Sequence, residues 1–190
     1  MSEVRRSPAA GAVEALLLIV RIPWIERKVL AMSRRALELF SVAADRVQSY
    51  FGPEKAYGLV ETALSDLVGF SLLTILRIEG TLVRRMHTSY PASYSVGGTK
   101  DIAADTWLRA MFDAGRPVVS ETRELMRERF PDHDAIFSLG CGAVLNVPVV
   151  AAGVTLGSLN LPHEAGPFSR EHALVARPFA MLLALAWTAE

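Results

Sequence analysis

The stretch from Ala143 to Trp187 reads AVLNVPVVAAGVTLGSLNLPHEAGPFSREHALVARPFAMLLALAW. Its first part holds two segments rich in branched residues, 144–149 and 154–161, with Ala152-Gly153 between them. Branched residues favour strands, and a short turn containing glycine is typical of a β-hairpin. Ser169, after Gly166-Pro167, predicts the N-cap of an apolar helix that runs to the end of the chain. The stretch therefore predicts a strand pair followed by a long terminal helix.

Upstream of this stretch, apolar spacing and turn residues predict alternating helices and strands. Helices are expected at 33–50, after Gly52-Pro53, from Asp105 or Thr106 to Gly115, over 121–129 and from Asp132 to Gly140, and strands at 70–78, 82–88 and 117–119. The segment 89–103 shows no periodicity and is expected to be a long loop. This order of elements predicts an α+β fold built on an antiparallel sheet.

Composition excludes several classes of protein. Hydrophobic residues make up 51% of the 190 residues and charged residues 21%, as in a globular chain. Twenty basic residues balance twenty acidic ones, which gives no electrostatic reason to bind nucleic acid. The early apolar run 15–20 is too short to span a bilayer, so no membrane segment is expected. A single cysteine, Cys141, allows no internal disulfide and favours a cytoplasmic location.

The first thirty or so residues differ from the rest of the chain. Ser7-Pro8 and Ile22-Pro23 interrupt helical patterns there, whereas a regular helical pattern begins just after Met32. We therefore expect an N-terminal extension at 1–31 and one domain at 32–190.

The amino-acid sequence of the C-terminal half resembles that of a GAF domain. The matching residues are Val147-Pro148-Val149, Gly153, Leu156-Gly157-Ser158-Leu159-Asn160-Leu161 and Phe168-Ser169-Arg170-Glu171. The resemblance covers roughly residue 33 to the C-terminus, and short stand-alone bacterial members are most similar. It implies a central sheet of five to six strands, terminal helices on one face, and loops and short helices covering a ligand pocket on the other.

The resemblance also implies a function. GAF domains are sensory modules, so the chain is expected to bind a small metabolite and to act in cytoplasmic signalling through a partner protein. Residues 89–103 and 121–140 would then cover the ligand. The alternative is a small enzyme of the same fold that uses His163 and Glu164, or Cys141, for its chemistry.

The sequence departs from the motifs of three known GAF activities. Members that bind cyclic nucleotides carry an Asn-Lys pair where this chain has His163-Glu164, although Phe168 and Glu171 are kept. Methionine sulfoxide reductases of this fold use several cysteines, and photoreceptors that bind bilins have an Asp-Ile-Pro element where Asp101-Ile102-Ala103 stands. No cofactor is identified on these grounds.

The segment around 89–107 supplies candidate ligand-binding residues. Tyr90, Tyr94 and Trp107 offer aromatic faces, and Lys100 offers one cation. Such a set suits the wall of a pocket that orients a ring or a carboxylate. The alternative is that the aromatic residues only fasten the loop to the sheet.

Asn146 and Asn160 interrupt the two apolar strands of the hairpin, and a buried asparagine needs a partner. A two-residue turn at Ala152-Gly153 pairs Asn146 with Leu159, which places the two asparagines on opposite faces. A three-residue turn would place both on one face. We favour the shorter turn and expect at most one of them in the pocket.

The remaining candidates are His163, Glu164 and Cys141. A histidine beside a carboxylate suits proton transfer, but the simpler interpretation, which we favour, is a loop pair that bonds to local backbone. Cys141 is either an exposed redox-sensitive thiol or a buried small side chain. The histidines lack ligand spacing, so no metal site is expected, and no catalytic residue is assigned.

The two terminal helices are the expected interaction surface. The last helix is apolar on more than one side, which predicts a homodimer formed through it and through the helix at 33–50. Pro178 is expected to kink or divide that last helix.

Overall fold

The computed structural model describes residues 24–48, 52–164, 166 and 168–188. Residues 1–23 of the predicted extension therefore lie outside the described residues, and so does Pro167 ahead of the last helix. The elements are α2 (Trp24–Gln48), α3 (Pro53–Leu67), β1 (Thr74–Glu79), β2 (Leu82–Thr88), β3 (Thr99–Asp101), α4 (Thr106–Ala114), β4 (Val118–Ser120), α5 (Arg123–Arg129), α6 (His133–Ser138), β5 (Ala143–Ala151), β6 (Val154–His163) and α7 (Arg170–Thr188). The chain divides into two compact units, residues 1–34 and residues 35–190.

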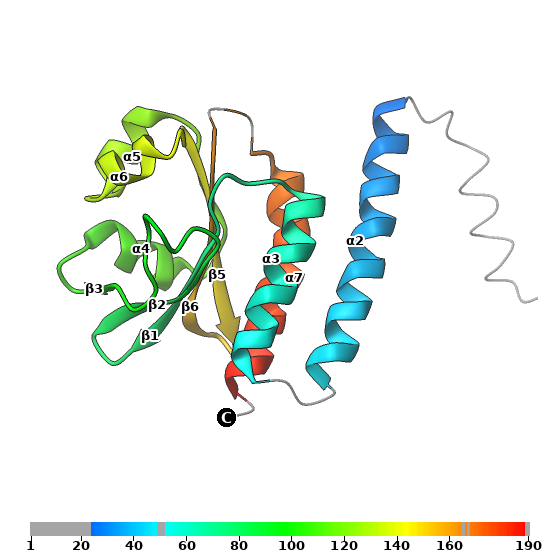
Figure 1. Cartoon of the computed structure of the whole chain (residues 1–190), viewed down its shortest axis with the longest axis horizontal. Helices are drawn as coiled ribbons and strands as arrows, with labels where there is room; N and C mark the ends of the chain where they lie inside the picture. Colours follow the sequence, from blue (N-terminus) through cyan, green and yellow to red (C-terminus); the bar gives the residue numbers. More distant parts are fainter. Residues whose placement is uncertain (1–23, 49–51, 165, 167, 189–190) are drawn as a thin grey trace, which may run out of the picture. The chain divides into compact units, whose positions relative to one another are not determined.

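The second unit is built on a six-stranded sheet in the order β3-β2-β1-β6-β5-β4. Every neighbouring pair is antiparallel. Helices α3 and α7 cover one face, and α4, α5 and α6 lie over the other (Figure 1). The predicted α+β architecture is confirmed: five to six strands, helices on one face and short helices on the other.

The apolar core lies between the sheet and α3 and α7. Alternate residues of the two central strands point into it, because side chains along a strand alternate between its faces. Leu145 and Val147 of β5 and Leu159 and Leu161 of β6 are fully buried there, with Phe179 of α7. Burying each such side chain contributes about 1.5–3 kcal/mol. The hairpin and α7 therefore stabilise each other.

The elements differ most from the sequence prediction at three places. The helix expected from residue 33 begins at Trp24, directly after Pro23, because nothing in the pattern at Met32 breaks it. The strand expected from residue 70 begins at Thr74, since the backbone N–H groups of Ser71 and Leu72 bond irregularly to Pro162. The expected loop at 89–103 contains the short strand β3, which pairs with β2 and lacks a readable period at three residues.

The helix termini follow their sequence signals. The Asp105 carboxylate accepts from the Leu108 backbone N–H at 2.9 Å and caps α4, and the Ser169 hydroxyl accepts from the Glu171 N–H at 3.2 Å. Helix α7 continues through Pro178, so the proline does not divide it. Among the described residues, no helix is both long and apolar enough to cross a membrane.

Candidate binding site

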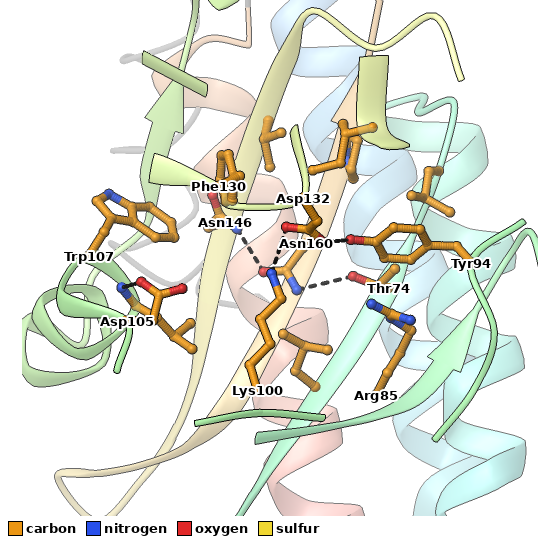
Figure 2. Close-up of a pocket in the computed structure, with 16 residues that line it drawn as sticks. Thr74, Arg85, Tyr94, Lys100, Asp105, Trp107, Phe130, Asp132, Asn146 and Asn160 are labelled. Atoms are coloured by element: carbon orange, nitrogen blue, oxygen red, sulfur yellow. Dashed lines mark hydrogen bonds and ion pairs between the residues drawn. The ribbon is translucent and has the colours of Figure 1, made fainter. Parts of the chain in front are cut away.

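A cavity of about 50 Å³ lies between the sheet and the short helices that cover its second face. Strands β1, β5 and β6 form its floor (Figure 2). The segment 94–108 and the connection between α5 and α6 form its sides and roof. The space is far smaller than the roughly 300–1,000 Å³ of most ligand pockets. It therefore suits a small molecule, or a larger one only after the cover moves.

A row of polar side chains crosses the floor of the cavity. The Asn146 Nδ2 amide donates to Asn160 Oδ1 at 2.8 Å, and Asn160 Nδ2 donates to the Thr74 hydroxyl at 3.1 Å. These are the only two asparagines of the chain, and both are buried, with Asn146 3% exposed. The row ends at Asn146 Oδ1, which finds no partner among the described residues.

The pairing of the two asparagines corrects the sequence prediction. The turn is the expected two-residue one, with Ala151 opposite Val154 and positive φ angles of 49° and 81° at Ala152 and Gly153. A β-bulge then inserts Leu156 between the pairs Val150–Thr155 and Val149–Gly157. An extra residue in one strand shifts the register by one. Asn146 therefore faces Asn160, and both line the cavity instead of at most one.

Arg85 of β2 and Tyr94 close one side of the cavity. The guanidinium carbon of Arg85 lies 3.8 Å from the centre of the Tyr94 ring, which is a cation–π contact. Arg85 Nη1 also donates to the Ser95 carbonyl at 2.7 Å, whereas its buried Nε has no partner among the described residues. The cavity thus presents a second unused polar atom, here a donor.

Asp132 joins the roof of the cavity to its sides. The Lys100 ammonium donates to Asp132 Oδ1 at 2.7 Å, and the Tyr94 hydroxyl donates to Asp132 Oδ2 (Figure 2). Burial opposes ionisation of Asp132, but Lys100 and Tyr94 outweigh it and hold its pKa below the ordinary value. Burial and the Asp132 carboxylate raise the pKa of Tyr94, which therefore stays protonated and donates.

Apolar residues complete the cavity. The Trp107 indole meets the Phe130 ring edge-on, with the ring centres 4.8 Å apart. Leu72 and Val144 contribute aliphatic surface from the sheet side. The cavity therefore combines an apolar wall with a few directed polar groups, as small-molecule sites do.

Five of the predicted site residues meet at this cavity: Tyr94, Lys100, Trp107, Asn146 and Asn160. Tyr90 does not line it and is 47% exposed. His163 and Glu164 do not line it either. The Glu164 backbone N–H donates to His163 Nδ1 at 2.7 Å, which is the local backbone bond of the simpler interpretation.

Cys141 is a buried side chain and not an exposed thiol. It is fully buried beside Met126 and Ile136. Burial, with a smaller contribution from Glu164, raises the pKa of the thiol to about 11. The reactive thiolate is therefore scarce at neutral pH.

Thr74, Arg85 and Asp132 also line the cavity but were not predicted from the sequence. Arg85 has a usable signal, because it lies two residues after the buried Val83 on β2 and so shares its face. Asp132 was assigned only as the start of a helix. The described residues contain no cluster of three or more histidine, cysteine or acidic side chains placed to hold a metal ion.

Comparison with sequence families and with curated proteins finds no match for this chain. Solved structures do match. The GAF domain of a phosphoenolpyruvate-protein phosphotransferase from Coxiella burnetii has a TM-score of 0.67 at 17% identity, over 82% of this chain and 94% of that one. The GAF domain of a two-component sensor histidine kinase from Bacillus halodurans has a TM-score of 0.61 at 14% identity, over 72% and 94%.

A third matching structure is a chromophore-binding domain. The chromophore-binding domain of a bacteriophytochrome from R. palustris gives a TM-score of 0.59 at 12% identity, over 81% of this chain and 63% of that one. Identities this low speak to the fold alone. The element order, the antiparallel six-stranded sheet and these structures together show that the chain has the GAF-domain fold.

Proposed function

We propose that this chain is a regulatory GAF module that binds a small cytoplasmic metabolite and signals through a partner protein. The fold supports this, because its structural relatives include domains of sensor histidine kinases and phosphotransferases. The cavity supports it independently, because it lies on the sheet face beneath a separate cover.

The observation that carries the proposal is the open end of the polar row. Asn146 Oδ1 is buried in the cavity without a partner, and so is Arg85 Nε at its side. Leaving a buried polar group unpaired costs about 1–3 kcal/mol. A ligand that bonds to either atom recovers this free energy. Unpaired buried polar atoms of this kind are expected in a binding site and are disfavoured in a packed core.

The thickness of one sheet separates the cavity from the helices. Asn160 and Thr74 face the ligand side, whereas their strand neighbours Leu159 and Ile75 are buried against the helices. If a ligand displaces β1 or β6, the strand therefore shifts the side chains that pack against α3 and α7. Packed layers transmit such shifts because they deform little.

We further propose that α7 forms a homodimer with a second copy of the chain. Leu174, Met181 and Leu185 lie on one side of α7 at spacings of seven and four residues, and all are more than half exposed. Light scattering should give twice the chain mass for wild type and the single mass for Met181→Glu. Val154→Glu, at an equally exposed valine of the hairpin turn, is the control and should stay dimeric. A monomeric wild type would contradict the dimer.

The test of ligand binding is native mass spectrometry of gently purified protein, compared with the denatured mass. Wild type should carry additional mass that is lost on denaturation. Asn146→Leu, which removes the polar end of the row at similar volume, should lose that mass. Thr155→Val is the matched control, because Thr155 donates to the Phe112 carbonyl outside the cavity. Retention of the same mass by Asn146→Leu would contradict the site.

A further inference from the structure

On the basis of the proposed ligand-binding role, we propose that the cavity takes a small carboxylate, whose place the Asp132 carboxylate holds within the chain. Two donors meet at this position, and a third group lies in the lining of the same cavity. The Lys100 ammonium and the Tyr94 hydroxyl already donate to Asp132, and Arg85, stacked on the Tyr94 ring, has a buried Nε–H without a partner among the described residues. A phenol and two cations of this kind are the groups that bind carboxylates.

Asp132 lies at a position where its side chain could instead cap a helix. It occupies the N-cap position of α6, where an aspartate normally accepts from a backbone N–H of the first turn. Here the carboxylate makes no such bond and reaches into the cavity instead. An incoming carboxylate that replaced it would release Asp132 to cap α6. The cap bond would offset part of the two bonds that Asp132 gives up to the ligand, as an internal competitor requires.

The attachment of α5 to the sheet determines which part of the cover can move when Asp132 is released. Arg129 at the end of α5 donates to the Val119 carbonyl at 3.2 Å and to the Ser120 hydroxyl at 2.9 Å, which fastens α5 to β4. Asp132 lies beyond this fastening, between α5 and α6. Its release therefore frees the α6 side of the cover while α5 stays attached.

Size and polarity narrow the ligand class. An apolar cavity of about 150 Å³ holds benzene, so 50 Å³ holds about two non-hydrogen atoms in addition to the carboxylate that takes the place of Asp132. The open end at Asn146 calls for a hydrogen-bonding group on the ligand. A hydroxyl satisfies it whichever way the asparagine amides are turned, since a hydroxyl both donates and accepts. The class is thus a short hydroxy-carboxylate of about two or three carbons.

The test is calorimetric titration of the full chain with glycolate and lactate, and with the neutral glycolamide and lactamide of the same size. The carboxylates should bind wild type and the amides should not. Asp132→Asn removes the internal competitor and should tighten carboxylate binding about tenfold or more. Lys100→Gln should weaken it by a similar factor. A merely structural role for the pair would shift both variants in the same direction.

The matched control is Asp134→Asn, which makes the same charge change two residues along at a side chain that is 94% exposed. It should bind as wild type does, and circular dichroism checks that each variant is folded. Equal binding of amides and carboxylates, or no gain in Asp132→Asn, overturns the proposal. If native mass spectrometry shows a ligand lost in Asn146→Leu while carboxylates fail to bind, only the ligand class is wrong. A chain that retains no ligand and binds no probe in any variant contradicts the proposed function too.

Discussion

Replacing Gly157 with alanine should break the contact between β1 and β6 that aligns the cavity floor. A Cβ atom at Gly157 would lie 2.0 Å from the Leu76 carbonyl oxygen and 3.0 Å from the Arg77 Cα. Both neighbours are backbone, so no side chain can turn away. Carbon–oxygen contacts between strands lie at about 3.3 Å, so β1 would have to retreat by about 1.3 Å.

The loss in the free energy of unfolding can be estimated from the pairing of β1 with β6. Gly157 pairs with Arg77, and three residues along, Asn160 pairs with Thr74. Overpacking typically costs about 1–3 kcal/mol, and a clash with backbone belongs at the upper end. For a chain of this size about 3 kcal/mol lowers the melting temperature by about 6–12 °C. The same retreat would separate Thr74 from Asn160 and weaken ligand binding.

Gly58→Ala is the matched control for this prediction. Gly58 is exposed in the middle of α3, and a Cβ there would meet nothing within 4 Å. Alanine in a helix is about 0.5–1 kcal/mol more favourable than glycine, so this variant should melt a few degrees higher. Urea unfolding followed by circular dichroism measures both free energies. A Gly157→Ala protein as stable as wild type would refute the reasoning about the β1–β6 contact.

Three further predictions concern buried polar groups. In a double-mutant cycle by urea unfolding, Asn146→Leu with Asn160→Leu should cost about 1–2 kcal/mol less than the sum of the single changes, because each single change leaves one amide unpaired; additive costs would contradict the bond between them. Because the folded-state pKa of Asp132 is lowered, its stabilisation should be present above about pH 4 and lost as pH falls through that lowered pKa, so the stability difference from Asp132→Asn should shrink in acid. A constant difference would show that the carboxylate is not held in this way. Cys141, with its pKa of about 11 and full burial, should react with a thiol reagent only after urea unfolds the chain, and rapid labelling of the native protein would contradict its burial.

Strong local signals made most of the fold predictable. Branched residues and the Ala152-Gly153 turn mark the hairpin at 144–161, and Asp105 and Ser169 mark helix starts that the structure confirms. Short elements escaped, because the three residues of β3 give no period and pair only through their neighbour β2. Local patterns thus identify elements that are stable by their own length and chemistry.

The charged half of the candidate site was harder to predict. The neighbours Arg84 and Arg85 differ in their surroundings, and only Arg84 lies at the surface, where it pairs with Glu79. Arg85 turns to the cavity because it shares its strand face with Val83. Lys100 and Asp132 lie 32 residues apart, and no local sequence pattern in either segment predicts that they pair. Ion pairs of this kind follow from the tertiary arrangement and are invisible to spacing.

The register of the hairpin shows which kind of sequence argument is the stronger. Counting outward from the turn ignored the apolar pattern of both strands. Leu145 and Val147 flank Asn146, and Leu159 and Leu161 flank Asn160, so any register that buries all four apolar side chains on one face must place both asparagines on the other. Turning Asn160 toward the apolar helix face would leave its amide unpaired there, at a cost of about 1–3 kcal/mol. The two-residue turn and this apolar pattern are compatible only if one residue is extra, and the bulge at Leu156 supplies it. A mismatch of one residue between the turn count and the burial pattern therefore predicts a bulge, and here it also identifies the floor of the binding site.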